Sequence, residues 1–207
     1  MAPSGMNFGT QHGRCLLCPQ KVSSLAVLCA SCARITSGTS PCFILLGAND
    51  DMHSQILKNF LATWKHPGPQ PQVTAIHAIL VDFQATMRFE HVRSSNNLPQ
   101  ETRLYRGWDR FGKAIYSTPV SSKAADYENK RNATSRNRDR VRHVMLARVA
   151  TGRMEVVHQD QPMRRDASKG FDSIRAPGGS AVNYTEYAVY KDYGALPIYI
   201  ISFRGGF

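Results

Sequence analysis

The spacing of apolar positions predicts a helix early in the chain and leaves the segment after it open. Between Met52 and Lys65, apolar residues recur at intervals of three and four, which keeps one face of a helix buried. The proline-rich stretch at 66–71 ends this helix, because proline lacks the backbone donor that a helix needs. A short buried strand is expected at Phe43–Leu46. The β-branched run Val73–Phe83 fits a helix and a strand almost equally well.

A strand, a turn and a helix follow one another in the middle of the chain. The stretch Phe111–Tyr116 is rich in aromatic and β-branched residues, which is typical of a strand. Pro119 interrupts it, and Ser121–Tyr127 reads as the start of a helix with serine as its N-cap. This arrangement would present backbone N–H groups and the Tyr127 ring to one cavity. The alternative for Tyr127 is simple packing in the core.

Alternation near the C-terminus places one carboxylate among aromatic side chains. In the predicted strand Tyr184–Tyr190, Glu186 shares a face with Tyr184, Ala188 and Tyr190. A lone carboxylate in such surroundings fits a pocket better than bulk solvent, so Glu186 is a candidate functional residue. The alternative is a surface carboxylate on an edge strand.

Composition and charge set the class of protein and the kind of partner. The 207 residues suffice for one sizeable core and a small accessory module, and no apolar run approaches the roughly 20 residues of a membrane span. The start of the chain lacks a secretory signal, so we expect an intracellular protein, nuclear or cytoplasmic, without a membrane partner. The net charge of +11 favours polyanionic partners or a phosphate-bearing ligand; a solvated basic surface is the alternative. The basic stretch 129–142 is expected to form an exposed loop.

Four cysteines near the N-terminus have the spacing of a structural zinc site. Two C-x-x-C pairs stand close together in the sequence, and each pair can place two thiolates on one metal ion. The predicted zinc ligands are Cys15, Cys18, Cys29 and Cys32. Two disulfides or four reduced thiols are the alternatives, and an intracellular location disfavours disulfides. We therefore expect a disordered segment at 1–13, a zinc-binding motif and linker at 14–40, and one larger domain at 41–207.

Several ordered motifs resemble the catalytic domain of the poly(ADP-ribose) polymerase family. The resemblance is closest to the small fungal members that carry a cysteine motif ahead of this domain. Its core motifs lie within 103–207, and four of them occur in the family's order. They are F-G-K-A-I-Y followed by S-S-K-A-A-D-Y, then H-V-M-L-A-R-V-A-T-G, then G-F-D-S-I, and finally Y-T-E-Y-A-V-Y.

This resemblance implies an α+β chain with an ADP-ribosyltransferase-like fold: two packed, mostly antiparallel sheets with flanking helices, plus a small N-terminal zinc knuckle. It implies transfer of ADP-ribose from NAD, with release of nicotinamide, to a protein or nucleic-acid acceptor. Transfer of single units is favoured, because the family's polymer-forming members use a His-Tyr-Glu set that is incomplete here.

The resemblance also assigns roles to individual residues. Glu186 would be the catalytic carboxylate, Tyr127 would stack on nicotinamide, and Tyr116 would line the other side of the ring. Arg106-Gly107 occupies the place of a His-Gly pair that binds NAD, unless that strand is lost and Gly107 belongs to a later segment. The family's pocket serine corresponds to Ala124, and Ser121 or Ser122 would have to replace its hydrogen bond.

Three functions remain open on the sequence. The first is the NAD-dependent transferase just described. The second is a catalytically degenerate relative with the same fold that serves as a binding or scaffold protein. The third is a nucleic-acid-binding zinc protein, for which the basic charge and the cysteines are the only support.

Overall fold

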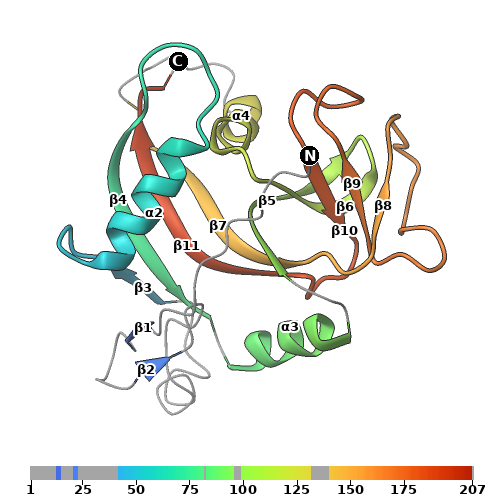
Figure 1. Ribbon diagram of the computed structural model, residues 1–207, viewed down its shortest axis with the longest axis horizontal. Helices are drawn as coiled ribbons and strands as arrows, with labels where there is room; N and C mark the ends of the chain where they lie inside the picture. Colours follow the sequence, from blue (N-terminus) through green and yellow to red (C-terminus); the bar gives the residue numbers. More distant parts are fainter. Residues whose placement is uncertain are drawn as a thin grey trace.

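The computed structural model describes residues 13–14, 21–22, 42–81, 83–95, 99–131 and 140–206. Figure 1 shows the arrangement of the elements. In chain order they are β1 (Gly13–Arg14), β2 (Lys21–Val22), β3 (Cys42–Leu45), α2 (Asp51–Ala62), β4 (Gln72–Leu80), α3 (Phe83–Ser95), β5 (Pro99–Asp109), β6 (Gly112–Thr118), α4 (Ser121–Arg131), β7 (Arg142–Ala150), β8 (Met154–Val156), β9 (Ser173–Ala176), β10 (Glu186–Val189) and β11 (Ala195–Arg204).

The strands form a two-stranded ribbon, β1-β2, and a nine-stranded sheet in the order β3-β4-β11-β7-β5-β6-β10-β9-β8. All neighbours in the large sheet are antiparallel except β8 and β9, which are parallel. The α+β class with mostly antiparallel strands is therefore confirmed. The large sheet is continuous, because β5 pairs with β7 through its first residues and with β6 through the rest.

The helix α2 covers the β3-β4-β11-β7 part of this sheet (Figure 1). Asp50 caps the helix, and its side chain accepts a hydrogen bond of 2.8 Å from the Met52 N–H. Phe60 is fully buried against Trp64 and Phe203, with ring centroids 5.6 and 5.3 Å away. Burial of such a ring contributes roughly 1.5–3 kcal/mol to folding. The predicted helix at Met52–Lys65 is confirmed, although it ends at Ala62.

The segment Val73–Phe83, whose apolar spacing fits both a helix and a strand, forms the strand β4 over most of its length. Residues of β4 pair with β3 on one side and with β11 on the other, so β4 is an interior strand where β-branched side chains pack well. The predicted strand at Phe43–Leu46 is also confirmed as β3. Its expected burial is confirmed for Leu46, which is 5% exposed, and wrong for Phe43 and Leu45, which are 51% and 62% exposed because β3 lies at the end of the strand order.

The helix α4 is joined to the end of α2 by its two serines. The Ser121 hydroxyl donates to the Phe60 carbonyl at 2.7 Å, and the Ser122 hydroxyl accepts from the Lys65 N–H at 3.1 Å. Both serines are fully buried and lie inside the helix. The predicted N-cap role is thus wrong: these hydroxyls bind backbone groups at the end of α2, which stabilises the position of α4.

The basic stretch 129–142 includes parts of a helix and of a strand. Residues 129–131 belong to α4, and Arg142 is buried in β7 with its guanidinium 4.5 Å from the centroid of the Phe203 ring. The prediction of one exposed loop over 129–142 is therefore wrong at both ends.

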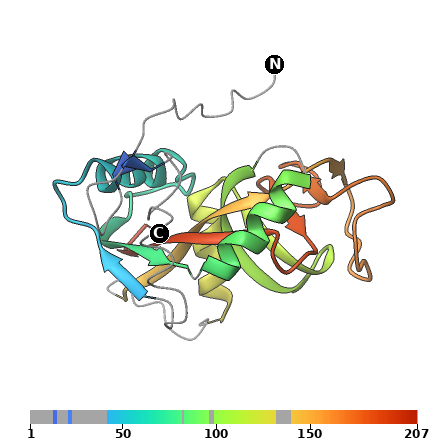
Figure 2. The same ribbon diagram turned by 90° about the horizontal axis from the view of Figure 1, so that it is seen from below.

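In Figure 2, α3 crosses the sheet near β11, where Phe89 packs against Ala150 and Leu196. Within the described residues, no helix is long and apolar enough to cross a membrane.

Candidate functional site

Glu186 opens β10 and is only 2% exposed. The strand lies between β6 and β9, so it is not an edge strand. Ala188 and Tyr190 pack into one apolar cluster with Tyr116, whereas Val189 packs into another, as the predicted alternation requires. The interpretation of Glu186 as a surface carboxylate is therefore wrong.

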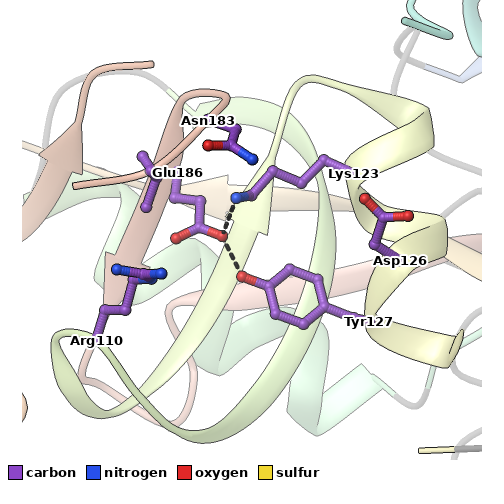
Figure 3. Close-up of a pocket in the computed structure, with 7 residues that line it drawn as sticks. Arg110, Lys123, Asp126, Tyr127, Asn183 and Glu186 are labelled. Carbon is purple, nitrogen blue, oxygen red and sulfur yellow. Dashed lines mark hydrogen bonds and ion pairs between the residues drawn. The ribbon is translucent and has the colours of Figure 1, made fainter. Parts of the chain in front are cut away.

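The helix α4 brings two side chains to this carboxylate. Lys123 and Tyr127 are four residues apart, which places them on the same helix face. The Lys123 ammonium lies 2.9 Å from Glu186 Oε1, and the Tyr127 hydroxyl donates a hydrogen bond to the same oxygen (Figure 3). Glu186 is thus held through Oε1 by both an ammonium and a phenol hydroxyl.

A cavity of about 160 Å³ adjoins the Glu186 carboxylate. It has three sides: the turn between β5 and β6, the helix α4, and the segment that leads into β10. Figure 3 shows Arg110 and the α4 side chains on opposite sides of the carboxylate. Typical sites for small molecules measure about 300–1,000 Å³, so this cavity fits one ring or sugar of a larger ligand. The lining residues are Arg110, Lys123, Asp126, Tyr127, Val182, Asn183 and Glu186.

Two predicted ligand-binding residues lie away from the cavity lining. Tyr116 is 1% exposed and stacks on Phe111, and its hydroxyl donates to the Gly112 carbonyl at 2.7 Å. The Tyr116 ring is therefore part of the hydrophobic core and does not line the cavity. The Ser122 hydroxyl is directed to Lys65 on the α2 side, so it does not replace the hydrogen bond missing at Ala124.

The structure describes the backbone of Arg106 and Gly107 within β5, where they pair with Ile115 and Ala114 of β6. Strand β6 separates them from β10, which carries Glu186. The predicted zinc ligands Cys15, Cys18, Cys29 and Cys32 lie outside the described residues. Within the residues described, no group of three or more His, Cys, Asp or Glu could hold a metal ion.

Ion pairs surround the cavity at different degrees of burial. The Lys123–Glu186 pair is the most enclosed, with Lys123 15% exposed. Asp126 Oδ2 lies within hydrogen-bonding distance of His66 Nε2, at 3.2 Å, which adds a further link between α4 and the segment after α2. Arg110 pairs with Asp160 at 2.8 Å, and both side chains are about half exposed. Sequence reasoning missed Lys123, although its spacing of four from Tyr127 was a signal that could have identified it.

A loop next to the cavity, residues 157–172 between β8 and β9, is tightly hydrogen-bonded. Burial raises the pKa of the Glu155 carboxyl, but hydrogen bonds from Ser168 and Arg164 outweigh this effect and lower the pKa below its usual value. Burial also raises the pKa of Tyr190 to about 12, and its hydroxyl donates to the Phe111 carbonyl at 2.8 Å. These groups fix the loop and the β5–β6 turn beside the site.

Neither the protein-family models nor the curated proteins with which the sequence was compared match it. The motifs in the sequence and the geometry of the Glu186 cavity are therefore what indicates the function. A buried carboxylate, a cation and an aromatic hydroxyl line this one small cavity.

Proposed function

We propose that this chain is an NAD-dependent ADP-ribosyltransferase that transfers single ADP-ribose units and releases nicotinamide. The observation that carries the proposal is the buried Glu186 carboxylate, held by Tyr127 and Lys123 at the edge of a cavity. These residues come from the S-K-A-A-D-Y and Y-T-E-Y motifs on which the resemblance to the poly(ADP-ribose) polymerase family rests. The finer fold assignment, an ADP-ribosyltransferase-like domain, belongs to the same proposal.

The chemistry requires a negative charge near the reacting sugar. The bond between ribose C1′ and the nicotinamide nitrogen breaks, its electron pair leaves with nicotinamide, and positive charge develops on the ribose. A fixed carboxylate stabilises this charge and accepts a hydrogen bond from a ribose hydroxyl. An acceptor oxygen then forms the new bond to C1′ and loses its proton to solvent. Glu186 is suited to this role, since its contacts to Oε1 orient the carboxylate before the substrate arrives.

The cavity fits part of NAD rather than the whole dinucleotide. Its volume of about 160 Å³ suits the nicotinamide end, and the rest of the dinucleotide would lie outside it. The Tyr127 ring forms part of the lining and can contact nicotinamide. Ala124 packs partly against the α2 core and offers no hydroxyl to the nicotinamide amide. One missing hydrogen bond of this kind weakens binding by about 0.5–1.5 kcal/mol, which lowers affinity without abolishing it.

Ala124 also supports a second candidate function, a binding or scaffold protein that retains the fold and has lost turnover. The two functions differ in one measurable property. The transferase binds NAD and releases nicotinamide, whereas the scaffold protein does not consume NAD.

The test combines calorimetry with a turnover assay on the full chain. Wild-type protein is expected to bind NAD in the micromolar range, which corresponds to about 8 kcal/mol. Glu186→Gln keeps the shape of the side chain and is expected to reduce nicotinamide release about 100-fold or more. Asp51→Asn, at the start of α2 and away from the cavity, is the control for a lost carboxylate. Folded wild-type protein that binds no NAD would refute the transferase, and binding without nicotinamide release would favour the scaffold.

The zinc site remains part of the proposal and has its own test. Four thiolates from Cys15, Cys18, Cys29 and Cys32 would bind one Zn²⁺ tetrahedrally. We expect about one zinc per chain by elemental analysis, and replacement of Cys15 and Cys18 by serine should remove it. Zinc retained by that double variant would contradict this ligand set.

A further inference from the structure

Arg110 lies in the turn between β5 and β6 and lines the cavity on the side opposite α4 (Figure 3). A neighbouring loop holds it at two points. The Arg110 carbonyl accepts a hydrogen bond of 2.7 Å from the Gln161 N–H. Its guanidinium Nη1 lies 2.8 and 3.0 Å from the two carboxylate oxygens of Asp160. Backbone and side chain are therefore both positioned by the start of this loop.

The loop that holds Arg110 is itself fixed. Arg164 hydrogen-bonds to Glu155, donates to Ser168 Oγ at 2.7 Å, and donates to the Asp166 carbonyl at 2.8 Å. Its backbone lies so close to Gly112 that an added Cβ there would be 1.8 Å from the Arg164 carbonyl oxygen. A guanidinium presented by such a support loses less conformational freedom when it binds a ligand.

The two cations of the cavity differ in how readily they can exchange partners. Taking Lys123 from Glu186 would leave a buried carboxylate without its counter-charge, which is strongly unfavourable. The Arg110–Asp160 pair is about half exposed on both sides, and solvent screens such a pair so that it contributes little. An anion that enters the cavity can therefore take Arg110 from Asp160 at small cost and cannot take Lys123.

We propose that Arg110 is a specificity-determining residue that binds a phosphate group of the ligand in this cavity. A guanidinium matches phosphate oxygens in a bidentate geometry, so a phosphate can replace the half-exposed Asp160 carboxylate as the partner of Arg110. The net charge of +11 favours the approach of such a ligand. The identity of the whole ligand rests on the proposed transferase function: the phosphate belongs to the NAD donor or to a phosphate-bearing acceptor.

The experiment compares wild type with Arg110→Gln, Arg110→Lys and Arg165→Gln by calorimetry. The probes are NAD, nicotinamide and inorganic phosphate, the last added to NAD-saturated protein and also to protein without NAD. Arg165→Gln is the matched control, because Arg165 is an exposed arginine of the same loop that does not line the cavity. Arg110→Gln should weaken binding of the phosphate-bearing probe about 10-fold, as expected for one charge-assisted contact. Arg110→Lys should restore part of this loss.

Each outcome decides one point. A weaker affinity of Arg110→Gln for NAD, with nicotinamide binding unchanged, supports the inference and assigns the phosphate to the donor. Unchanged NAD binding with weaker phosphate binding to the NAD-saturated protein supports it and assigns the phosphate to the acceptor. Equal effects of Arg110→Gln and Arg165→Gln, or no effect of Arg110→Gln on any probe, overturn it. If wild type binds neither NAD nor nicotinamide, the transferase proposal fails, and inorganic phosphate alone then tests Arg110.

Discussion

Lys123 and Glu186 form an ion pair of 2.9 Å in which Glu186 is 2% and Lys123 15% exposed. The carboxylate comes from a strand and the ammonium from a helix that lies about 60 residues earlier in the chain. Because water is largely excluded from this pair, each charge depends on the other for its stability in the folded state. The pair thus couples the position of α4 to that of β10 and holds the candidate catalytic carboxylate in place.

Substitution of Lys123 by methionine should lower the free energy of unfolding by about 3 kcal/mol, because the Glu186 charge is left buried without its partner. The double variant Lys123→Met with Glu186→Gln should recover a large part of this loss, since it leaves no uncompensated charge. Urea denaturation of the two single variants and the double variant measures the coupling. Losses that simply add in the double variant would show that the pair does not act as described.

Removal of the Tyr127 hydroxyl should separate orientation of Glu186 from contact with nicotinamide. In Tyr127→Phe the ring remains and the hydrogen bond to Glu186 is lost, so nicotinamide release should fall about 10-fold while nicotinamide binding changes little. Tyr127→Ala should weaken nicotinamide binding as well.

The matched control is Tyr193→Phe, since Tyr193 is an exposed tyrosine that hydrogen-bonds to Arg88 and does not line the cavity. Tyr193→Phe should leave both nicotinamide binding and release unchanged. Equal kinetics of Tyr127→Phe and wild type would contradict the orienting role of the hydroxyl.

Much of the fold could be predicted from sequence, because its signals are local. The apolar spacing at Met52–Lys65 reports the buried face of a helix, and the alternation at Tyr184–Tyr190 reports which side chains of a strand share a face. Both predictions are confirmed. The joining of the strands into one sheet could not be predicted in this way. It depends on β5 continuing from β7 to β6, which is set by long-range pairing.

Those residues of the candidate site that stand in local sequence motifs could be predicted, and those placed by long-range contacts could not. Tyr127 and Glu186 stand in recognisable motifs, and the structure brings them together. The roles of Ser121 and Ser122 depend on the end of α2, about 60 residues away, so their local helix-start pattern was misleading. Arg110 is likewise placed by a loop that lies far from it in sequence.

Gly112 is expected to tolerate no side chain. Its φ is +79°, and an added Cβ would lie 1.8 Å from the Arg164 carbonyl oxygen, a backbone atom that cannot move without the loop. Gly112→Ala should therefore lower the free energy of unfolding by more than about 2 kcal/mol, as strain and displacement of the loop add.

Gly179 offers a control with the same backbone strain and no steric contact. Its φ is +84°, and a Cβ there would meet nothing within 4 Å. Gly179→Ala should cost about 1 kcal/mol, from backbone strain alone. Equal losses in the two variants, measured by urea denaturation, would exclude a steric role for the contact between Gly112 and Arg164.

Tyr190 should make the protein less stable at high pH. Burial raises its pKa from 10.0 to about 12, so the unfolded chain loses this proton at a lower pH than the folded chain. The stabilising contribution is complete below pH 10 and is lost as the pH rises through 12. A shift of this size corresponds to roughly 2.7 kcal/mol, and the partial exposure of the side chain reduces the expected effect to about 1 kcal/mol.

Urea denaturation at pH 9 and at about pH 11.5 should show this decline in wild type. It should be smaller in Tyr190→Phe, which has no phenol to ionise, and Tyr193→Phe should behave like wild type because Tyr193 is exposed. The same decline in Tyr190→Phe as in wild type would assign the effect to other groups.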